Sequence, residues 1–269
     1  MSRKHKEVVQ KQFTKTIEAY SKYAVRDTAE VMAEKVEFTK AQPNDAILDV
    51  GCGPGAFALA LAPRVRFALG VDLTLEMLRQ ARVFRMEKKV LNAAFACADA
   101  EQLPFAAAAF DLVTCQCAFH HIPKPELVLQ EMVRVTKPEG RVLIIDTLAP
   151  ESDAKFELHN RIEKLRDPSH ARTLRLTKFL ALFEAYGLEV ARQALRRRQR
   201  SFNHWMLRAG LNPSHKRYLE TRKLLEDSVS GDLAGFSAQI QGHDILITHN
   251  EGMFLLQKTA NPEGSAGSR

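Results

Sequence analysis

Short apolar runs alternate with longer amphipathic stretches in the first two thirds of the chain. The apolar runs predict buried strands at 46–50, 67–71, 93–97, 110–115 and 141–146. Between them, apolar residues recur at helical spacing and predict helices at 55–62, 74–88 and 124–136. Strands that alternate with helices are typical of a parallel sheet with helices on both faces. The pattern therefore predicts an α/β fold with a doubly wound, mostly parallel sheet.

The N-terminal segment, residues 3–40, has a helical pattern as well. Its apolar positions form one stripe at helical spacing: Phe13, Ile17, Tyr20 and Ala24. This stripe either packs on the sheet domain or closes over a ligand as a lid, in which case Tyr20 faces the ligand.

The chain beyond residue 150 is less regular. The features predicted there are a polar helical insert at 150–176, a helix at 177–186, a sixth strand at 188–193, irregular helical sequence at 201–240, and a hairpin at 244–258 that turns at 249–252. We therefore expect four regions along the chain: an N-terminal helical lid (1–42), a ligand-binding core with its insert (43–194), C-terminal helices and a hairpin that complete the sheet (195–260), and a disordered tail (261–269).

A glycine-rich turn follows the first predicted strand. Gly51, Gly53 and Gly55 allow a sharp turn and let a ligand lie against the main chain. Asp72 ends the second apolar run, at a distance where an acidic residue can hydrogen-bond to a ribose. Asp49 precedes the glycines, and a carboxylate is a poor neighbour for a diphosphate but a good one for a cation. The turn therefore favours S-adenosylmethionine, which carries an ammonium and a sulfonium, over NAD.

Polar residues also follow the other predicted strands. Gly51, Asp72, Asp99 and Gln116 fall at strand ends, and right-handed crossovers would bring these ends to one edge of the sheet. We expect them to converge on one crevice. Asp99 is placed to accept a hydrogen bond from an adenine amino group, while the backbone N–H of Ala100 meets a ring nitrogen; alternatively, Asp99 only stabilises a turn.

Two residue pairs could suggest a metal, and neither does so strongly. His120 and His121 are adjacent, so on a helix they would point in different directions; one packs or caps the next helix and the other faces the substrate. Cys115 and Cys117 form a C-x-C pair without a second cluster, which is weak evidence for zinc. We predict no metal site.

Composition and charge narrow the class of protein. No apolar run approaches the ~20 residues that span a bilayer, and MSRKHKEVVQ lacks an apolar signal core. The four cysteines are expected to be reduced, buried thiols, so we predict a cytoplasmic protein. The net charge is +7, and the densest basic cluster is Arg196, Arg197, Arg198 and Arg200. This cluster is either a solvated edge or a contact with an anionic substrate or a membrane surface; without a nucleic-acid motif around it, no nucleic-acid partner is expected.

Four segments carry a resemblance to a known family: DVGCGPG, GVDLTLEML, ADAEQLPF and FDLVTCQCAFHHIPKPELVLQEMVRVTKPEGRVLIIDTLAP. They resemble the class I S-adenosylmethionine-dependent methyltransferases, and in particular the bacterial small-molecule branch related to ubiquinone and menaquinone biosynthesis C-methyltransferases. NRIEKLRDPSHAR is similar to the same branch. The resemblance runs from about Val9 to Val190. It implies a Rossmann-like methyltransferase fold with a seven-stranded sheet, a helical lid and a helical insert.

The resemblance also implies which residues bind S-adenosylmethionine. They are Asp49, Gly51, Gly53, Gly55, Asp72, Leu73, Met77, Asp99, Ala100, Cys115, Gln116 and Tyr20. Among them, Asp49 would lie near the ammonium, Asp72 would hold the ribose, and Leu73 and Met77 would enclose the adenine. Tyr20 would close from the N-terminal helix.

Methyl transfer from a sulfonium needs alignment above all, and it needs a base only where the acceptor must lose a proton. The candidate bases are His121, His120, Tyr20 and His159. We expect a small acceptor such as a phenol or quinone. Basic residues of the insert indicate either a polar or anionic acceptor or a solvated helix face: Arg161, Lys164, Arg166 and Arg172. Two alternatives stay open at this point, a protein that binds S-adenosylmethionine without methyl transfer and an NAD-dependent oxidoreductase. The sequence leaves open whether the chain is a monomer or a homodimer.

Overall fold

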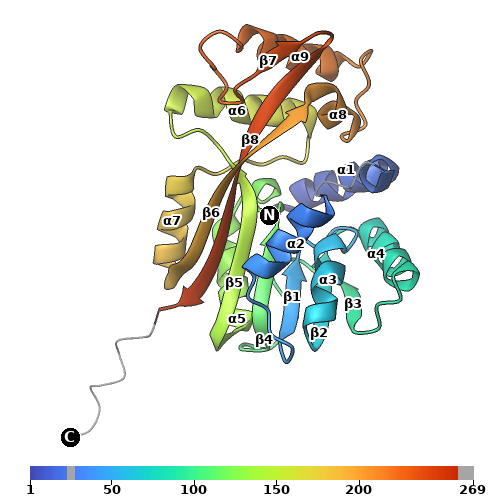
Figure 1. The fold of residues 1–269 in the computed structure, drawn as a ribbon, viewed down its shortest axis with the longest axis vertical. Coiled ribbons are helices and arrows are strands. Elements are labelled where there is room, and N and C mark those ends of the chain that lie inside the picture. The colour runs from blue at the N-terminus through green and yellow to red at the C-terminus, as the bar shows by residue number, and fades with distance from the viewer. Residues whose placement is uncertain (23–27, 260–269) are drawn as a thin grey trace, which may run out of the picture.

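The computed structural model describes residues 1–22 and 28–259, and the side chains of residues 1–18 and 28–259. A central sheet organises these residues (Figure 1). Its strands run in the order β3-β2-β1-β4-β5-β8-β6, and a short β7 pairs with one end of β8. The strands are β1 (Ala46–Val50), β2 (Phe67–Asp72), β3 (Ala93–Cys97), β4 (Phe110–Gln116), β5 (Thr136–Leu148), β6 (Leu188–Ser201), β7 (Gln239–Gln241) and β8 (Asp244–Lys258).

The first five strands are parallel, and β8 runs antiparallel between β5 and β6. This arrangement confirms the doubly wound, mostly parallel α/β fold. Seven strands lie along the main path of the sheet, as expected, and β7 adds an eighth. The helices are α1 (Arg3–Lys22), α2 (Ala29–Phe38), α3 (Ala56–Leu61), α4 (Leu75–Glu87), α5 (Pro125–Val135), α6 (Asp153–Arg166), α7 (Leu176–Ala185), α8 (Phe202–Leu207) and α9 (Lys216–Asp227).

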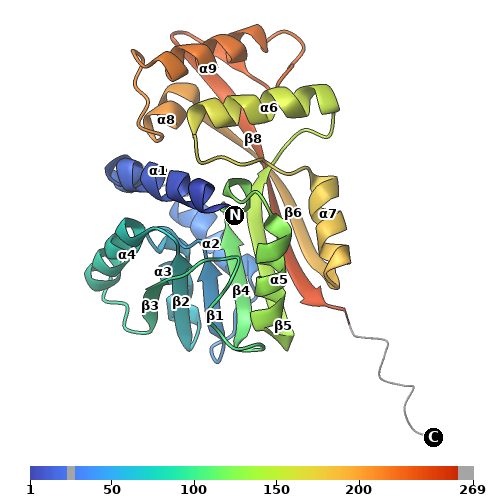
Figure 2. The ribbon, with the colours of Figure 1, turned by 180° about the vertical axis from the view of Figure 1, so that it is seen from behind.

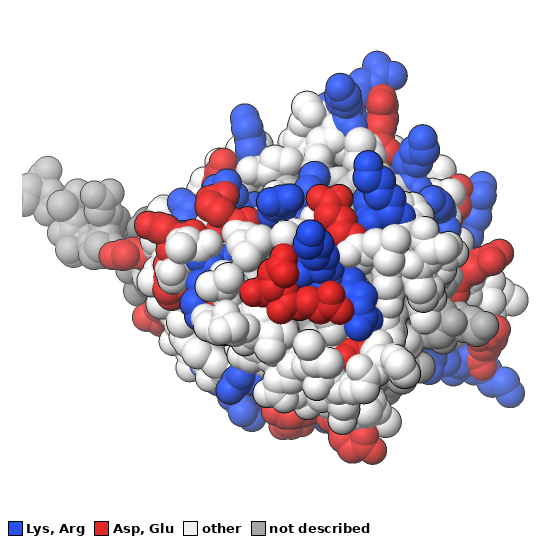
Figure 3. Space-filling view, turned by 90° about the horizontal axis from the view of Figure 1, so that it is seen from above, with Lys and Arg blue, Asp and Glu red and all other residues white. Residues whose placement is uncertain are grey.

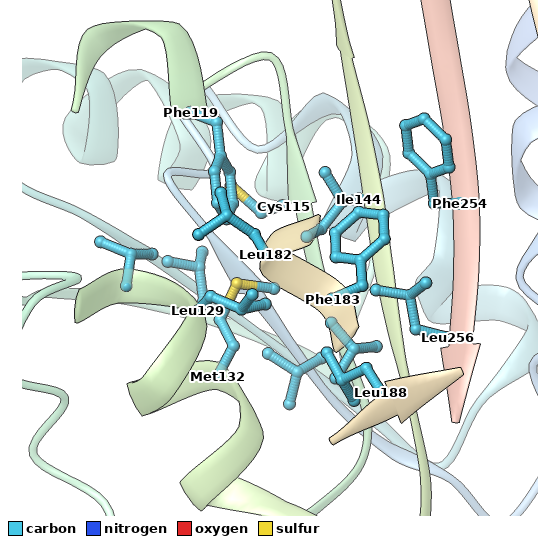
Figure 4. Packing of buried hydrophobic residues seen from close by; sticks show 14 of the residues in the cluster. Cys115, Phe119, Leu129, Met132, Ile144, Leu182, Phe183, Leu188, Phe254 and Leu256 are labelled. Atoms are coloured by element: carbon cyan, nitrogen blue, oxygen red, sulfur yellow. The ribbon is translucent and has the colours of Figure 1, made fainter. Parts of the chain in front are cut away.

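Helices cover both faces of the sheet because successive strand residues point to opposite sides. In β5, Leu143 and Ile145 pack with residues of α2, α3 and α4. Val142 and Ile144, the intervening residues, pack with α5 and α7 instead. Figure 4 shows this second layer, where Met132 of α5 and Phe183 of α7 lie against the sheet.

A separate hydrophobic cluster lies beyond the parallel strands. Strands β6 and β8 extend past the sheet's carboxyl edge, and α6, α8 and α9 pack around their ends (Figure 2). Phe202, Trp205 and Phe236 are buried at its centre. Helix α1 lies between this upper layer and the parallel strands in both views. Seen from above, acidic and basic side chains are interspersed on the upper layer (Figure 3).

Three expectations about the C-terminal part are wrong. Residues 249–252 form no turn: β8 continues through them because it is paired with β5 on one side and β6 on the other. Gly252, which suggested a turn, is required there because a Cβ would lie 2.6 Å from the ring of Phe254. The hairpin turn lies instead between Gln241 and Asp244. Strand β6 continues to Ser201 rather than ending at 193, so the boundary expected at 194 falls inside a strand.

Some expectations concern residues that are not described, and one concerns cysteine burial. The tail at 261–269 and the side chain of Tyr20 lie outside the described residues. All four cysteines are free thiols, but Cys97 is exposed and Cys117 is half-buried, so only Cys52 and Cys115 are buried as expected. No helix of residues 1–22 and 28–259 combines the length and apolar character needed to cross a membrane.

Candidate functional site

The carboxyl ends of β1, β2 and β4 surround a cavity of about 170 Å³, together with the loop after β3. We call it the donor cavity. The predicted convergence of strand ends is confirmed, because Gly51, Asp72, Asp99 and Gln116 all line it. Ten of the twelve residues named from the family resemblance line it: Asp49, Gly51, Gly53, Asp72, Leu73, Met77, Asp99, Ala100, Cys115 and Gln116. Gly55 does not line it. A Cβ at Gly55 would lie 2.6 Å from the ring of Phe95, so this glycine faces the protein core rather than the cavity.

Hydrogen bonds from the glycine turn hold it against β2. The backbone N–H of Gly51 donates to the carbonyl of Val71 at 2.8 Å. Gly53 donates its N–H to Oδ2 of Asp72 at 2.9 Å, and Oδ1 of the same carboxylate accepts from the N–H of Thr74 at 2.8 Å. Asp72 therefore fixes the turn and also borders the cavity.

Two buried carboxyl groups give the donor cavity its electrostatic character. Burial raises the pKa of Asp49 to about 7, although a hydrogen bond from the Thr114 hydroxyl at 2.8 Å opposes the shift. Burial also raises the pKa of Asp72, and the two charges disfavour one another. Among the described residues, neither Lys nor Arg lines this cavity. A cationic ligand would stabilise the ionised form of both carboxyl groups.

Helix α1 closes the donor cavity from above, with Met1, Val9 and Phe13 in its wall. Several side chains of α1 bind the strand-end loops. Lys6 pairs with Asp99 and lies 3.2 Å from Oε2 of Glu101. The amide of Gln10 donates to the carbonyl of Leu73 at 3.0 Å, and His5 Nε2 lies 2.9 Å from the carbonyl oxygen of His121. The N-terminal helix thus covers the site, while the position of the Tyr20 side chain stays outside the described residues.

A second, more polar cavity of about 60 Å³ adjoins the first. Phe13, Cys117 and His121 line both cavities, so they form a common wall. The remaining lining comes from α1, the turn η2 (Phe119–His121), β5, α6, β6, α8, β8 and the residues just after α6 and α8. Its charged or ionisable members are His120, Glu163, Arg166, Asp167, Arg200, Arg208 and His249. The sequence alone did not single out Glu163, Arg208 or His249.

The two adjacent histidines take different positions, as expected. His120 Nδ1 lies 2.6 Å from Oδ1 of Asp146, a buried carboxyl at the end of β5, and the His120 ring borders only the second cavity. His121 belongs to the common wall, with Ser169 Oγ 3.0 Å from its Nδ1. Burial lowers the pKa of His121 to about 4, and the neighbouring His120 adds to this shift.

His159 is wrongly placed among the candidate bases. Its Nδ1 lies 3.1 Å from the carbonyl of Ala234, and its ring stacks on Phe236 with the centroids 4.2 Å apart. It is buried and lines neither cavity.

Of the four basic residues singled out in the insert, Arg166 lines the second cavity, and the other three line neither of the two cavities. Lys164 donates to the carbonyl of Pro168 at 2.8 Å. Arg161 and Arg172 likewise engage other residues, since Arg161 lies 3.6 Å from Glu220 and Arg172 stacks over Phe156. The insert's charges therefore act mostly outside the site.

The arginine cluster of β6 is not a uniform solvated edge. Alternate residues lie on one face: Arg196 pairs with Glu34, Arg198 lies 3.3 Å from Glu251, and Arg200 lines the second cavity. Arg197 points to the other face and is exposed. The twofold period of a strand would have given this division, had the sixth strand been extended beyond 193.

Known proteins resemble this chain in sequence and fold. Residues 48–144 match a family model described as a methyltransferase domain. YcgJ of Bacillus subtilis, an uncharacterized methyltransferase, is 38% identical over 176 residues, which cover 65% of this chain and 70% of YcgJ. The crystal structure of YcgJ matches with a TM-score of 0.78 at 29% identity, covering 85% of this chain and 98% of YcgJ. A putative methyltransferase of Bacillus halodurans matches with a TM-score of 0.80 at 27% identity, covering 86% of this chain and 100% of that one.

The match to a relative with a stated activity covers a smaller share of that relative. The malonyl-(acyl-carrier protein) O-methyltransferase of a Methylovorus species is 32% identical over 156 residues. The match covers 54% of this chain and 51% of that protein.

Proposed function

This chain belongs to the class I S-adenosylmethionine-dependent methyltransferases, and we propose that it methylates a small molecule held in the second cavity. The observation that carries this proposal is that Phe13, Cys117 and His121 line both cavities, so a polar cavity large enough for part of a small acceptor lies directly beside the donor cavity. In-line transfer needs the acceptor atom in contact with the methyl carbon, and adjoining cavities allow this. The family supports methyl transfer over the two alternatives left by the sequence, binding without transfer and NAD-dependent oxidation.

The residues of the donor cavity fit S-adenosylmethionine. When bound, this cofactor supplies an electrophilic methyl group on a sulfonium. Asp49 would accept hydrogen bonds from its ammonium and Asp72 from its ribose hydroxyls, and both carboxyls would gain a positive neighbour. The buried Oε1 of Gln116 has no hydrogen-bond partner in the described part of the chain, and it would accept from the same ammonium.

The apolar and loop residues of the donor cavity would complete the site. Leu73 and Met77 would enclose the adenine. Asp99 and the backbone N–H of Ala100 would read its polar edge. The backbone near Cys115 would lie beside the methionine part.

His120 is the side chain best placed to take a proton from an acceptor hydroxyl. Its Nδ1–H donates to Asp146, which leaves Nε2 as the proton acceptor and places a carboxylate where the imidazolium would form. His120 would take the proton of the acceptor O–H, so that the oxygen could bond to the methyl group that the bound cofactor would supply, with the neutral thioether as its leaving group. His121 is the weaker candidate because its pKa is lowered to about 4.

The test combines cofactor binding with a panel of phenols, quinones and amines. We expect S-adenosylhomocysteine release and a methylated product, both identified by mass spectrometry, with at least one phenol. His120→Asn should lower kcat by about a hundredfold or more, with cofactor affinity unchanged by calorimetry.

His243→Asn is the matched control because His243 lies exposed in the β7–β8 turn. It should leave kcat and the pH profile as they are. Cofactor binding with no methylated product from the whole panel would overturn the proposed acceptor class. A fully active His120→Asn enzyme would instead remove His120 from the mechanism.

A further inference from the structure

We propose that the C-terminal end of α4 docks this protein on an anionic lipid surface. The docking face is the α4 ridge, which consists of Val83, Met86, Lys88, Lys89 and Leu91. Its apolar side chains would enter the layer of lipid headgroups, and its lysines would lie beside the phosphates. Docking is independent of the proposed methyl transfer, because no residue of the ridge lines the donor cavity or the second cavity.

The apolar side chains of the α4 ridge are unusually exposed. Val83, Met86 and Leu91 are 46%, 78% and 87% exposed, and the last two are the most exposed large apolar residues in the described part of the chain. Single exposed apolar residues are common on protein surfaces and need no explanation, whereas several at one end of one helix indicate a binding face.

Hydrogen bonds fix the turn that carries Leu91. After α4 ends, the N–H of Val90 donates to the carbonyl of Arg85 at 3.1 Å. On the other side of Leu91, Nδ2 of Asn92 donates to the carbonyl of Ala62 at 2.8 Å. Both neighbours of Leu91 are therefore held by the fold, and the turn presents its side chain to solvent in a defined position.

Lys89 has a backbone conformation that glycine adopts more easily. Its φ is +53°, the left-handed conformation in which many helices end. A lysine at this position costs stability that a glycine would keep. The helix dipole favours a cation here, but the dipole explains neither the exposed Met86 nor the exposed Leu91. A cation beside exposed apolar side chains is what binding to an anionic lipid surface requires.

The charges of the α4 ridge are available to such a surface. Residues 83–91 contain three basic side chains, Arg85, Lys88 and Lys89, and one acidic side chain, Glu87. None of these four groups belongs to an ion pair with any described residue, and none has an interaction beyond those of the described residues. Both lysines are exposed, and an anionic membrane attracts each lysine that lies near its surface.

The size and position of the α4 ridge favour a lipid surface over a protein partner. The ridge is the end of a helix beside β3, the edge strand of the sheet (Figure 1). A stable protein interface buries about 800 Å² on each partner, which is more than three apolar side chains can expose. Insertion of a few apolar side chains, together with attraction between lysines and anionic headgroups, suffices for reversible attachment to a membrane surface.

Vesicle flotation tests this docking face with the full chain. The vesicles consist of phosphatidylcholine alone, or of phosphatidylcholine and phosphatidylglycerol in equal parts. The parent should bind the anionic vesicles about tenfold or more tightly than the neutral ones, and about 1 M salt should remove most of this difference. Met86→Ser/Leu91→Ser should weaken binding to the anionic vesicles about tenfold, and Lys88→Gln/Lys89→Gln should weaken it about tenfold or more.

Matched controls come from exposed residues of α9 and β7 in the upper layer. Leu219→Ser/Ile240→Ser replaces two apolar side chains that are 55% and 60% exposed, and Lys216→Gln/Lys223→Gln replaces two exposed lysines. Both controls should bind the vesicles as the parent does. All four double variants should keep the parent's affinity for S-adenosylhomocysteine, which shows that the fold and the donor cavity are intact.

No binding of the parent to anionic vesicles would overturn the docking face, and so would full binding by both α4 double variants. Loss of binding in the α9 and β7 controls, with binding kept in the α4 variants, would place the contact elsewhere and overturn it as well. A dimeric parent that becomes monomeric with Met86→Ser/Leu91→Ser, by analytical ultracentrifugation, would reassign the ridge to a contact between two copies. Methyl transfer without vesicle binding would overturn the docking face and leave the proposed function standing.

Discussion

Nζ of Lys35 lies 3.2 Å from Oε2 of Glu251, and both side chains are almost wholly buried where α2 packs on β8. Glu251 also receives Arg198, whose NH1 lies 3.3 Å from the same oxygen. One carboxylate therefore lies between two cations that come from α2 and from β6. This charge arrangement lies on β8, which is paired with β5 on one side and with β6 on the other.

Removing the carboxylate should cost more than removing the lysine. Glu251→Gln removes the carboxylate that both cations contact, and breaking a buried pair in this way costs about 3–5 kcal/mol of unfolding free energy. Lys35→Met leaves Glu251 with Arg198, so we expect a loss nearer ~1–2 kcal/mol. Urea unfolding at pH 7 measures both. The exposed pair Arg222–Glu226 supplies the control, since Glu226→Gln should change stability by less than about 0.5 kcal/mol. An equal loss for both buried variants would contradict the central role of Glu251.

Cofactor affinity should depend on pH through Asp49. The carboxyl binds a cation only when ionised, and its pKa in the free protein is raised to about 7 by burial. Between pH 5.5 and 7.5, affinity for S-adenosylhomocysteine should therefore rise about twentyfold. Asp49→Asn should bind more weakly at pH 7.5 and show almost no pH dependence in calorimetry. An unchanged pH dependence in this variant would assign the titration to another group.

The raised pKa of Asp49 also affects the stability of the ligand-free protein, and here the effect of rising pH is unfavourable. The folded state holds a proton on Asp49 up to about pH 7, whereas an unfolded aspartate loses it near pH 4. Unfolding free energy is therefore lost as the pH rises through this window. Asp49→Asn should be more stable than the parent at pH 8 and about equally stable at pH 4, by thermal unfolding without ligand. A variant less stable at pH 8 would show that the ionised carboxyl supports the fold.

Local sequence patterns predicted the parallel strands and the residues of the donor cavity. The other elements depend on contacts between segments distant in sequence, which local patterns do not show. Asp49, Asp72 and Asp99 could be found because each follows an apolar run, and the ends of parallel strands meet at one edge. Asp146 ends a predicted strand in the same way and could have been found by the same signal. Arg208 could not, because its place in the second cavity depends on how α8 packs against β6 and β8, which no local pattern records.

The predicted turn at 249–252, which the structure replaces by a continuous β8, is wrong for a similar reason. The sequence from His249 to Gly252 has the composition of a turn, and a turn was the better local interpretation. In the fold, His249 pairs with Glu163 of α6, and Gly252 accommodates the ring of Phe254. The partner of His249 is distant in sequence, whereas the partner of Gly252 is two residues away on the same strand and is placed there only because the strand continues.

Substitutions at two glycines of the turn should distinguish an effect on stability from an effect on cofactor binding. Gly55 has φ +78°, and a Cβ there would meet the Phe95 ring at 2.6 Å, so Gly55→Ala combines backbone strain with overpacking and should cost about 2–4 kcal/mol. Gly53 has φ +53° with no atom within 4 Å of its Cβ position, so Gly53→Ala should cost only about 1 kcal/mol.

Binding should show the reverse order. Gly53 lines the donor cavity, so an added methyl group narrows the space for the cofactor, whereas Gly55 lies outside the lining. Calorimetry at a temperature where both variants are folded should therefore find weaker S-adenosylhomocysteine binding for Gly53→Ala than for Gly55→Ala. The opposite order of affinities would place the cofactor against Gly55.

The contacts of α1 should govern how fast the cofactor leaves. Lys6 joins this helix to Asp99 and Glu101 beside the donor cavity, and a half-buried pair of this kind stabilises the closed position by roughly 1 kcal/mol. Lys6→Met should therefore speed S-adenosylhomocysteine dissociation about fivefold in stopped-flow experiments and increase amide exchange over residues 3–18. Lys4→Met, an exposed change on the same helix, should alter neither rate. Faster exchange without faster dissociation would show that α1 covers the cavity but does not limit cofactor release.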